Sequence, residues 1–159
     1  MFFKGLVNNK RWRGRFFRYA PLILWTGVVL FASTTSGSMS KTSIFIRPIL
    51  EFLFPNATEE TLLVYHSFIR KCAHFVEYAI LAFWAARAFS GSSRAVLRKY
   101  WHVGSFLLVV LIASIDETNQ SFNPLRTGSP LDVLLDAFGG SMMILAVIFY
   151  RFFFPKRSR

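Results

Sequence analysis

The chain has 159 residues, 53% of them hydrophobic, and its 19 Lys and Arg against 8 Asp and Glu give a formal charge of +11. This length fits one domain, and the apolar content excludes an intrinsically disordered chain. Cys72 is the single cysteine, so an internal disulfide framework is excluded as well. Because the basic residues alternate with apolar segments instead of forming one face, we expect membrane lipids as partners and no nucleic acid.

Four segments are apolar enough to cross a bilayer, which needs about 20 residues per helix. In chain order they are Phe17 to Thr34, His66 to Phe89, Tyr100 to Gln120, and Leu131 to Phe154. The sequence therefore predicts an all-α integral membrane protein with four transmembrane helices. We divide it into a basic cytoplasmic N-terminal segment (residues 1–18), a single four-helix membrane domain (residues 19–154) and a basic cytoplasmic tail (residues 155–159).

The distribution of charge predicts the orientation of these spans. With both termini inside, most of the 19 basic residues are cytoplasmic, whereas all 8 acidic residues fall in outer loops or at the outward ends of spans. This is the pattern of a multi-pass protein of the cell membrane. The first span has an alternative interpretation as a signal peptide cleaved near residues 36–38. We favour a span, because four spans keep the basic tail inside.

The segment between the first two spans is not a simple loop. Residues 44–54 are mostly apolar, but Arg47, Pro48 and Glu51 interrupt them. Because the run is too short to span and too apolar to be solvated, it predicts a short interfacial or re-entrant segment. Thr58 then predicts the N-cap of a new helix with acidic residues in its first turn.

The second span carries ionisable residues at a depth where lipid disfavours them. At 3.6 residues per turn, Arg70, His74 and Glu77 fall within an arc of about 60° and form a polar stripe. Glu77 lies about 10 Å deeper than Arg70 along the helix, and an ionised carboxylate inside the membrane costs roughly 3 kcal/mol. These side chains must therefore face protein and find partners.

Further polar residues occur near the outer ends of the third and fourth spans. They are Asp116, Glu117 and Gln120 of the third span, Arg126 of the following loop, and Asp132 and Asp136 of the fourth span. Ser129 predicts the N-cap of the fourth span, with Pro130 at the first helical position and Asp132 completing a capping box. Gly139 and Gly140 predict the close approach of another helix. We expect the polar residues to converge on a charged cavity that opens to the outer face.

A binding or shielding protein is the function that we expect of this cavity. Arg70, Lys71 and Arg126 would hold an anionic lipid headgroup or a cell-wall precursor, and the acids would orient a sugar or amine. The predicted ligand-binding residues are Arg70, Lys71, Asp116, Glu117, Gln120, Arg126, Asp132 and Asp136. The sequence leaves the oligomeric state open.

Four other interpretations of the same residues stay open, and one of them is a conducting or transporting role, for which four spans offer little room unless the protein oligomerises. An enzyme acting on a lipid-linked envelope substrate, a hydrolase or transferase, would use His74 and Glu77 as catalytic acid and base, although no nucleophile motif accompanies them. A divalent metal could be held by His74, Glu77, Asp116 and Asp136, although we expect neither a metal nor a cofactor. A purely structural ion network would use the same residues to hold the helices together.

The ordered polar set also resembles the signature of VanZ-like membrane proteins. The matching positions are Arg70-Lys71-x-x-His74-Phe75-x-Glu77-Tyr78, Asp116-Glu117-x-x-Gln120-x-Phe122, Arg126, Ser129-x-x-Asp132 and Asp136-x-x-Gly139. The resemblance implies a small multi-span protein of the bacterial cytoplasmic membrane and cell envelope, and the namesake gives low-level resistance to the glycopeptide antibiotic teicoplanin. The family is broad, so resistance by this chain does not follow. Many members carry Asn at the position of Asp136. The aspartate gives this chain one more negative charge than those members have at that position.

Overall fold

A computed structural model describes residues 10–34, 39–122 and 129–154, and these residues form helices and short connections without a strand. The helices are α2 (Lys10–Ala32), α3 (Met39–Leu53), α4 (Glu59–Ser90), α5 (Ala95–Lys99), α6 (Trp101–Ser121) and α7 (Pro130–Phe153). The predicted all-α class is therefore confirmed for this part of the chain.

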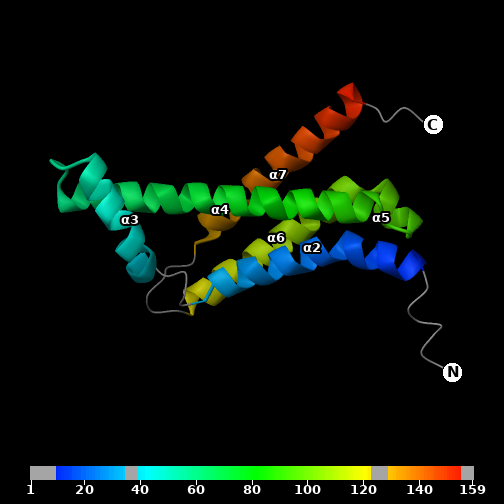
Figure 1. Cartoon of the computed structure of the whole chain (residues 1–159), viewed down its shortest axis with the longest axis horizontal. Helices are drawn as coiled ribbons and strands as arrows, with labels where there is room; N and C mark the ends of the chain where they lie inside the picture. Colours follow the sequence, from blue (N-terminus) through cyan, green and yellow to red (C-terminus); the bar gives the residue numbers. More distant parts are fainter. Residues whose placement is uncertain (1–9, 35–38, 123–128, 155–159) are drawn as a thin grey trace.

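The helix α4 is the centre of the molecule. Figure 1 shows it running the full length of the fold, with α2 and α6 beside it, α7 crossing it and α3 against its beginning. Its buried face is rich in alanine, which lets the neighbouring helices approach closely. Leu81 and Ala85 of α4 pack with Val29 of α2, Val109 of α6 and Ile144 of α7 in one hydrophobic core.

Three of the described helices are long and apolar enough to cross a membrane, namely Gly14–Ala32, Trp101–Ser121 and Pro130–Phe153. They match the predicted first, third and fourth spans closely. The predicted second span lies within α4, which begins earlier than expected, at Glu59 rather than at His66. The first helix likewise extends back to Lys10, into the predicted basic N-terminal segment.

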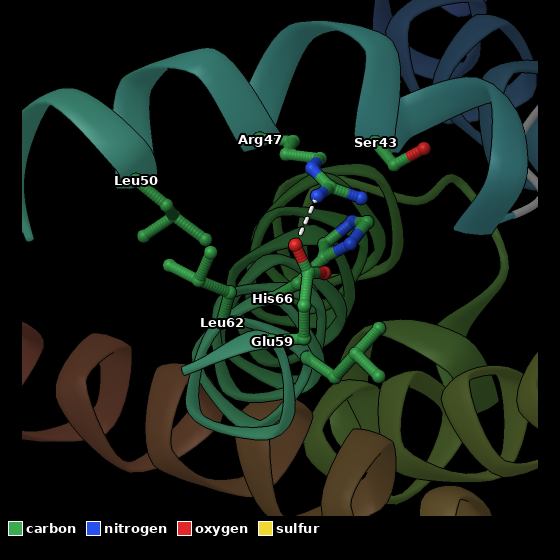
Figure 2. A pocket seen from close by; sticks show the side chains of 7 residues that line it. Ser43, Arg47, Leu50, Glu59, Leu62 and His66 are labelled. Atoms are coloured by element: carbon green, nitrogen blue, oxygen red, sulfur yellow. Dashed lines mark hydrogen bonds and ion pairs between the residues drawn. The ribbon is translucent and has the colours of Figure 1, made fainter. Parts of the chain in front are cut away.

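The predicted interfacial segment is the helix α3, which packs against the beginning of α4. Ile44, Phe45 and Phe52 are exposed on it, as expected of a helix that meets lipid at an interface. Arg47 donates a hydrogen bond to Glu51 at 2.7 Å and pairs with Glu59 across a cavity of ≈260 Å³ between the two helices (Figure 2). Thr58 caps α4 as predicted, since its side chain accepts from the backbone N–H of Thr61.

Helix α2 is an integral part of the bundle. The indole Nε1 of Trp25 donates to the backbone carbonyl of Glu77 at 3.0 Å, and Ser33 Oγ donates to the backbone carbonyl of Asp116 at 3.2 Å. Val29 between them is 1% exposed. These contacts tie α2 to α4 and α6, and the interpretation of α2 as a span stays a prediction. The predicted cleavage site at residues 36–38 lies outside the described residues.

One end of the bundle gathers the beginning of α2, the α4–α5 turn and the end of α7. Tyr19 donates to Ser92 at 2.9 Å, and Arg151 donates to Ser90 at 2.6 Å. The described basic residues Arg18, Arg87, Arg98 and Arg151 all lie at this end. The short helix α5, between the predicted second and third spans, is an addition to the predicted elements.

The beginning of α7 crosses α4 and α6 at very short range. A Cβ atom at Gly139 would lie 2.5 Å from the backbone carbonyl oxygen of Phe75, and one at Gly140 would lie 2.8 Å from a methyl group of Val109. Only glycine permits this approach. The prediction that these two glycines admit another helix is therefore confirmed, and the contact brings Asp136 of α7 against α4.

Candidate functional site

Ionisable and polar side chains meet where the middle of α4 contacts the end of α6 and the beginning of α7. We call this group the polar cluster; its members are His74, Tyr78, Asp116, Glu117, Gln120 and Asp136. Its three carboxylates are almost completely enclosed, with exposures of 3% for Asp116, 6% for Glu117 and 0% for Asp136. Two helices, α6 and α7, thus bring acids into the interior, where ionisable residues are rare.

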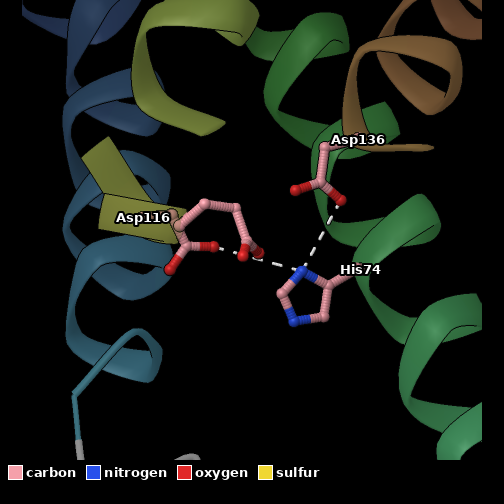
Figure 3. A group of neighbouring side chains, drawn as sticks. His74, Asp116 and Asp136 are labelled. Carbon is pink, nitrogen blue, oxygen red and sulfur yellow. Dashed lines mark ion pairs between the residues drawn. The ribbon is translucent and has the colours of Figure 1, made fainter. Parts of the chain in front are cut away.

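His74 is the residue that faces acids from two other helices. Its Nδ1 atom lies 3.5 Å from Oδ1 of Asp136 and 4.0 Å from Oδ2 of Asp116 (Figure 3). The same figure shows the opposite side of the imidazole ring turned away from both carboxylates. The sequence paired His74 with Glu77 on its own helix as acid and base; its ion-pair partners here are Asp116 and Asp136 instead.

Asp116 is fixed by neutral hydrogen-bond donors. Tyr78 donates its hydroxyl to Oδ2 at 2.9 Å, and Gln120 donates its amide Nε2 to Oδ1 at 2.9 Å. The amide oxygen of Gln120 in turn accepts from Arg70 at 2.8 Å. A chain of hydrogen bonds therefore runs from the half-buried guanidinium of Arg70 to the buried carboxylate of Asp116. Tyr78 was not among the predicted site residues, although its position one helical turn after His74 is a signal that could have found it.

Glu117 connects the polar cluster to the start of α7. Its Oε2 atom accepts from the backbone N–H of Ser129 at 2.9 Å. Ser129 is the predicted N-cap, and its hydroxyl accepts from the backbone N–H of Leu131. The predicted capping box is wrong for Asp132. In a capping box, Asp132 would accept a hydrogen bond from the backbone N–H of Ser129, but that N–H donates to Glu117 instead. Asp132 instead lies 4.0 Å from the ammonium group of Lys71.

Of the remaining predicted site residues, the structure describes Glu77, which stands apart from the polar cluster. Glu77 is half-buried and close enough to His74 and Tyr78 to interact with them electrostatically, but it is outside the group of carboxylates that surrounds His74. Arg126 lies outside the described residues.

The predicted cavity above the cluster stays a prediction, since the two cavities described for the chain are lined by other residues. One is the cavity between α3 and α4, and the other, of ≈1090 Å³, lies between α4 and α7 toward the arginine-rich end.

The polar cluster combines several atoms suited to bind a ligand. His74, Asp116, Glu117 and Asp136 each offer one nitrogen or oxygen, and these atoms all lie within 4.8 Å of one another. The set contains three carboxylates and a single imidazole, so its negative charge exceeds its positive charge. Such a group can transfer protons, hold a cation, or serve as a rigid support for neighbouring cationic side chains such as Arg70.

Comparison with known proteins places this arrangement in a family. Searches of curated proteins and of solved structures gave no match. The profile of the VanZ/LLP1 family matches residues 17–153, which include most of α2, the polar cluster and all of α7. The chain therefore belongs to the VanZ/LLP1 family.

Proposed function

We propose that the protein crosses the membrane four times with both termini in the cytoplasm. The three apolar helices supply three spans, and residues 70–90 of α4 supply the fourth, because a helix of this length is about 30 Å long, the thickness of the hydrocarbon core. The arginines gathered at one end of the bundle support the assignment of that end to the cytoplasm. The polar cluster then lies toward the outer face, with α3 in the outer interface.

We further propose that the outer edge of the polar cluster binds the phosphate of a membrane lipid or of a lipid-linked envelope precursor. The observation that carries this proposal is the anchoring of Arg70 by buried Gln120, which is itself held by Asp116. A guanidinium has five N–H donors in a planar arrangement that suits phosphate. Lys71, exposed on the next position of α4, adds a second positive charge at the same depth.

Native mass spectrometry of the protein purified from membranes tests this binding. We expect the wild type to retain a phosphate-bearing lipid, whose mass distinguishes a phospholipid from a polyprenyl-linked precursor. Arg70→Gln should reduce the retained fraction at least about tenfold, the loss that 1.4 kcal/mol of binding energy produces. Arg94→Gln, at the exposed N-cap of α5 after the far end of α4, is the control. Equal retention in the two variants would contradict the proposal.

A second candidate is an acid–base enzyme acting on the same class of lipid-linked substrate. It is favoured by the position of His74, whose Nδ1 faces two carboxylates while the other side of the ring points away from them (Figure 3). This is how a carboxylate orients a catalytic imidazole. If the protein is such an enzyme, we expect His74→Gln to abolish turnover of the co-purifying lipid while the lipid is still retained. Unchanged turnover in this variant would exclude a catalytic role for His74.

Glycopeptide resistance is a separate question from the ligand of the polar cluster. The guanidinium of Arg70 suits a phosphate and does not distinguish a particular antibiotic. We therefore propose reduced sensitivity to teicoplanin only as a consequence of altered envelope precursors. Expression of the wild type and of Arg70→Gln in a teicoplanin-sensitive host tests this link. The proposal requires that any protection by the wild type is lost in the variant.

A further inference from the structure

We propose that the polar cluster is a binding site for one divalent cation of the Mn²⁺ or Mg²⁺ type, held by His74, Asp116, Glu117 and Asp136. The four residues come from α4, α6 and α7, so the ion would join the three helices at their crossing. In the metal site considered from the sequence alone, Glu77 is the fourth ligand. Glu117 has that place in the structure, because α6 turns it toward Asp136 and His74.

The spacing of the four side chains fits a single ion. Oxygen ligands lie about 2.0 to 2.6 Å from Mg²⁺ or Ca²⁺, so two ligands of one ion are at most about 5 Å apart. The ligand atoms of the cluster all fall within 4.8 Å of one another. The distances of 3.5 Å and 4.0 Å from His74 Nδ1 to Asp136 and Asp116 are longer than hydrogen bonds and match neighbouring ligands around a metal.

A second observation points to a ligand independently of this spacing. Among the described residues, no hydrogen bond reaches either carboxylate oxygen of Asp136, which is 0% exposed. Oε1 of Glu117 and Nδ1 of His74 are also buried without a hydrogen bond. Buried polar atoms are nearly always paired, and a buried carboxylate without compensation is strongly unfavourable. A cation in the centre of the group would satisfy all of these atoms together.

The surrounding residues hold the ligands in the way that metal sites require. Tyr78 and Gln120 fix the carboxylate of Asp116, and the backbone N–H of Ser129 fixes the second oxygen of Glu117. Hydrogen bonds of this kind orient metal ligands and strengthen binding. Among the described residues, Oε1 of Glu117 and both oxygens of Asp136 are left without a hydrogen bond.

The chemistry of the ligands selects the class of ion. Three carboxylates and one imidazole favour Mn²⁺ or Mg²⁺ over soft ions, which prefer cysteine. Cys72, the only cysteine of the chain, is exposed and is not one of the four ligands. A charge of +2 offsets two of the three carboxylates. Arg70, which donates a hydrogen bond to Gln120, places a further positive charge near the cluster. The ion would also add a positive charge near a phosphate bound by Arg70 and Lys71; this role rests on the proposed function, whereas the ion site does not.

The test uses Mn²⁺ alone on the full chain in detergent. After removal of bound metal with EDTA, Mn²⁺ is titrated and binding is followed by electron paramagnetic resonance and by the shift in Tm. We expect one Mn²⁺ per chain, a rise in Tm of several degrees at saturation, and displacement by Mg²⁺. Asp136→Asn and Glu117→Gln should each weaken Mn²⁺ binding at least about tenfold, as even residues behind the ligands do in metal sites. Glu60→Gln, an exposed acid in the first turn of α4, should leave it unchanged.

The outcomes separate this proposal from the preceding one. Absence of Mn²⁺ binding by the wild type, or equal binding by the wild type and both cluster variants, would overturn the ion site. Binding of Zn²⁺ without any binding of Mn²⁺ would overturn the assignment to this class of ion. If Mn²⁺ binds as expected but no phosphate-bearing lipid is retained, the proposed function fails and the ion site stands. The wild-type titration needs no variant, so a variant that does not fold leaves the test intact.

Discussion

Asp136 of α7 faces His74 of α4 in the interior of the molecule, with 3.5 Å between Oδ1 and Nδ1. The same nitrogen lies 4.0 Å from Asp116 of α6, so one imidazole contacts acids of two other helices. His74 thus places one imidazole of α4 against the buried carboxylates of α6 and α7.

Replacement of His74 should therefore destabilise the bundle. Truncation in His74→Ala removes the imidazole and leaves two buried carboxylates facing each other. We expect a loss of about 3 to 5 kcal/mol, the cost of breaking a buried pair. Thermal unfolding in detergent measures this loss. His102→Ala, at an exposed position of α6, is the control. An equal loss of stability in both variants would show that His74 does not stabilise the bundle through the buried carboxylates.

Tyr78 and Asp116 should behave as a coupled pair, since both are buried and joined by a hydrogen bond of 2.9 Å. Tyr78→Phe removes one donor from a buried carboxylate, which we expect to cost about 1 to 3 kcal/mol. In Asp116→Asn, the hydroxyl of Tyr78 loses its charged acceptor. The double variant should lose less than the sum of the single losses. Strict additivity would contradict the pairing, and Tyr150→Phe, on an exposed tyrosine, controls for removal of a hydroxyl.

The sequence predicted most of the local features of the fold because each depends on a few neighbouring residues. Thr58 and Ser129 are helix caps, Pro130 begins α7, and the two glycines admit a close helix crossing. The helical positions of Arg70 and His74 likewise follow from the number of residues per turn. Such predictions require no knowledge of how the helices pack.

Partners across helices could not be predicted in the same way. Helical periodicity places Glu77 on the same stripe as His74, but it does not say which neighbour faces that stripe or at what height. The crossing of α7 over α4 at Gly139 brings Asp136 to His74. The group of acids around His74 then includes Glu117 in place of Glu77. The exchange of Asp132 for Glu117 at the backbone N–H of Ser129 has the same origin.

Gly139 should tolerate no side chain. A methyl group there would meet the backbone carbonyl of Phe75 at 2.5 Å, and backbone cannot move aside cheaply. We expect Gly139→Ala to cost about 1 to 3 kcal/mol through overpacking. Gly27→Ala is a matched control in α2, because no atom lies within 4 Å of a Cβ at that position. It should be neutral or stabilising, since alanine favours the helix by up to about 1 kcal/mol. A similar Tm for both variants would contradict the close crossing.

Arg47 should contribute little to stability despite its two acidic partners. It donates to Glu51 and pairs with Glu59, thereby linking α3 to α4 (Figure 2). All three side chains are about half exposed or more, and exposed ion pairs contribute at most about 1 kcal/mol. We expect Arg47→Gln to lower the Tm by no more than a few degrees, and less in high salt. A loss as large as that of His74→Ala would show that α3 is essential to the bundle.

The proposed topology predicts opposite labelling at the two ends of α4. In a Cys72→Ser background, Asn56→Cys lies before α4 and Ser93→Cys lies after it, and both positions are exposed. If α4 crosses the membrane with its beginning outside, a membrane-impermeant maleimide added to intact cells labels Asn56→Cys and leaves Ser93→Cys unlabelled. Permeabilised cells should label both, which controls for reactivity. Labelling of both in intact cells would mean that α4 does not cross, and reversed labelling would mean that the arginine-rich end faces outward, against the distribution of positive charge. The experiment tests α4 directly, because this helix carries His74 and Tyr78 of the polar cluster and is not among the three helices whose hydropathy marks them as candidate spans.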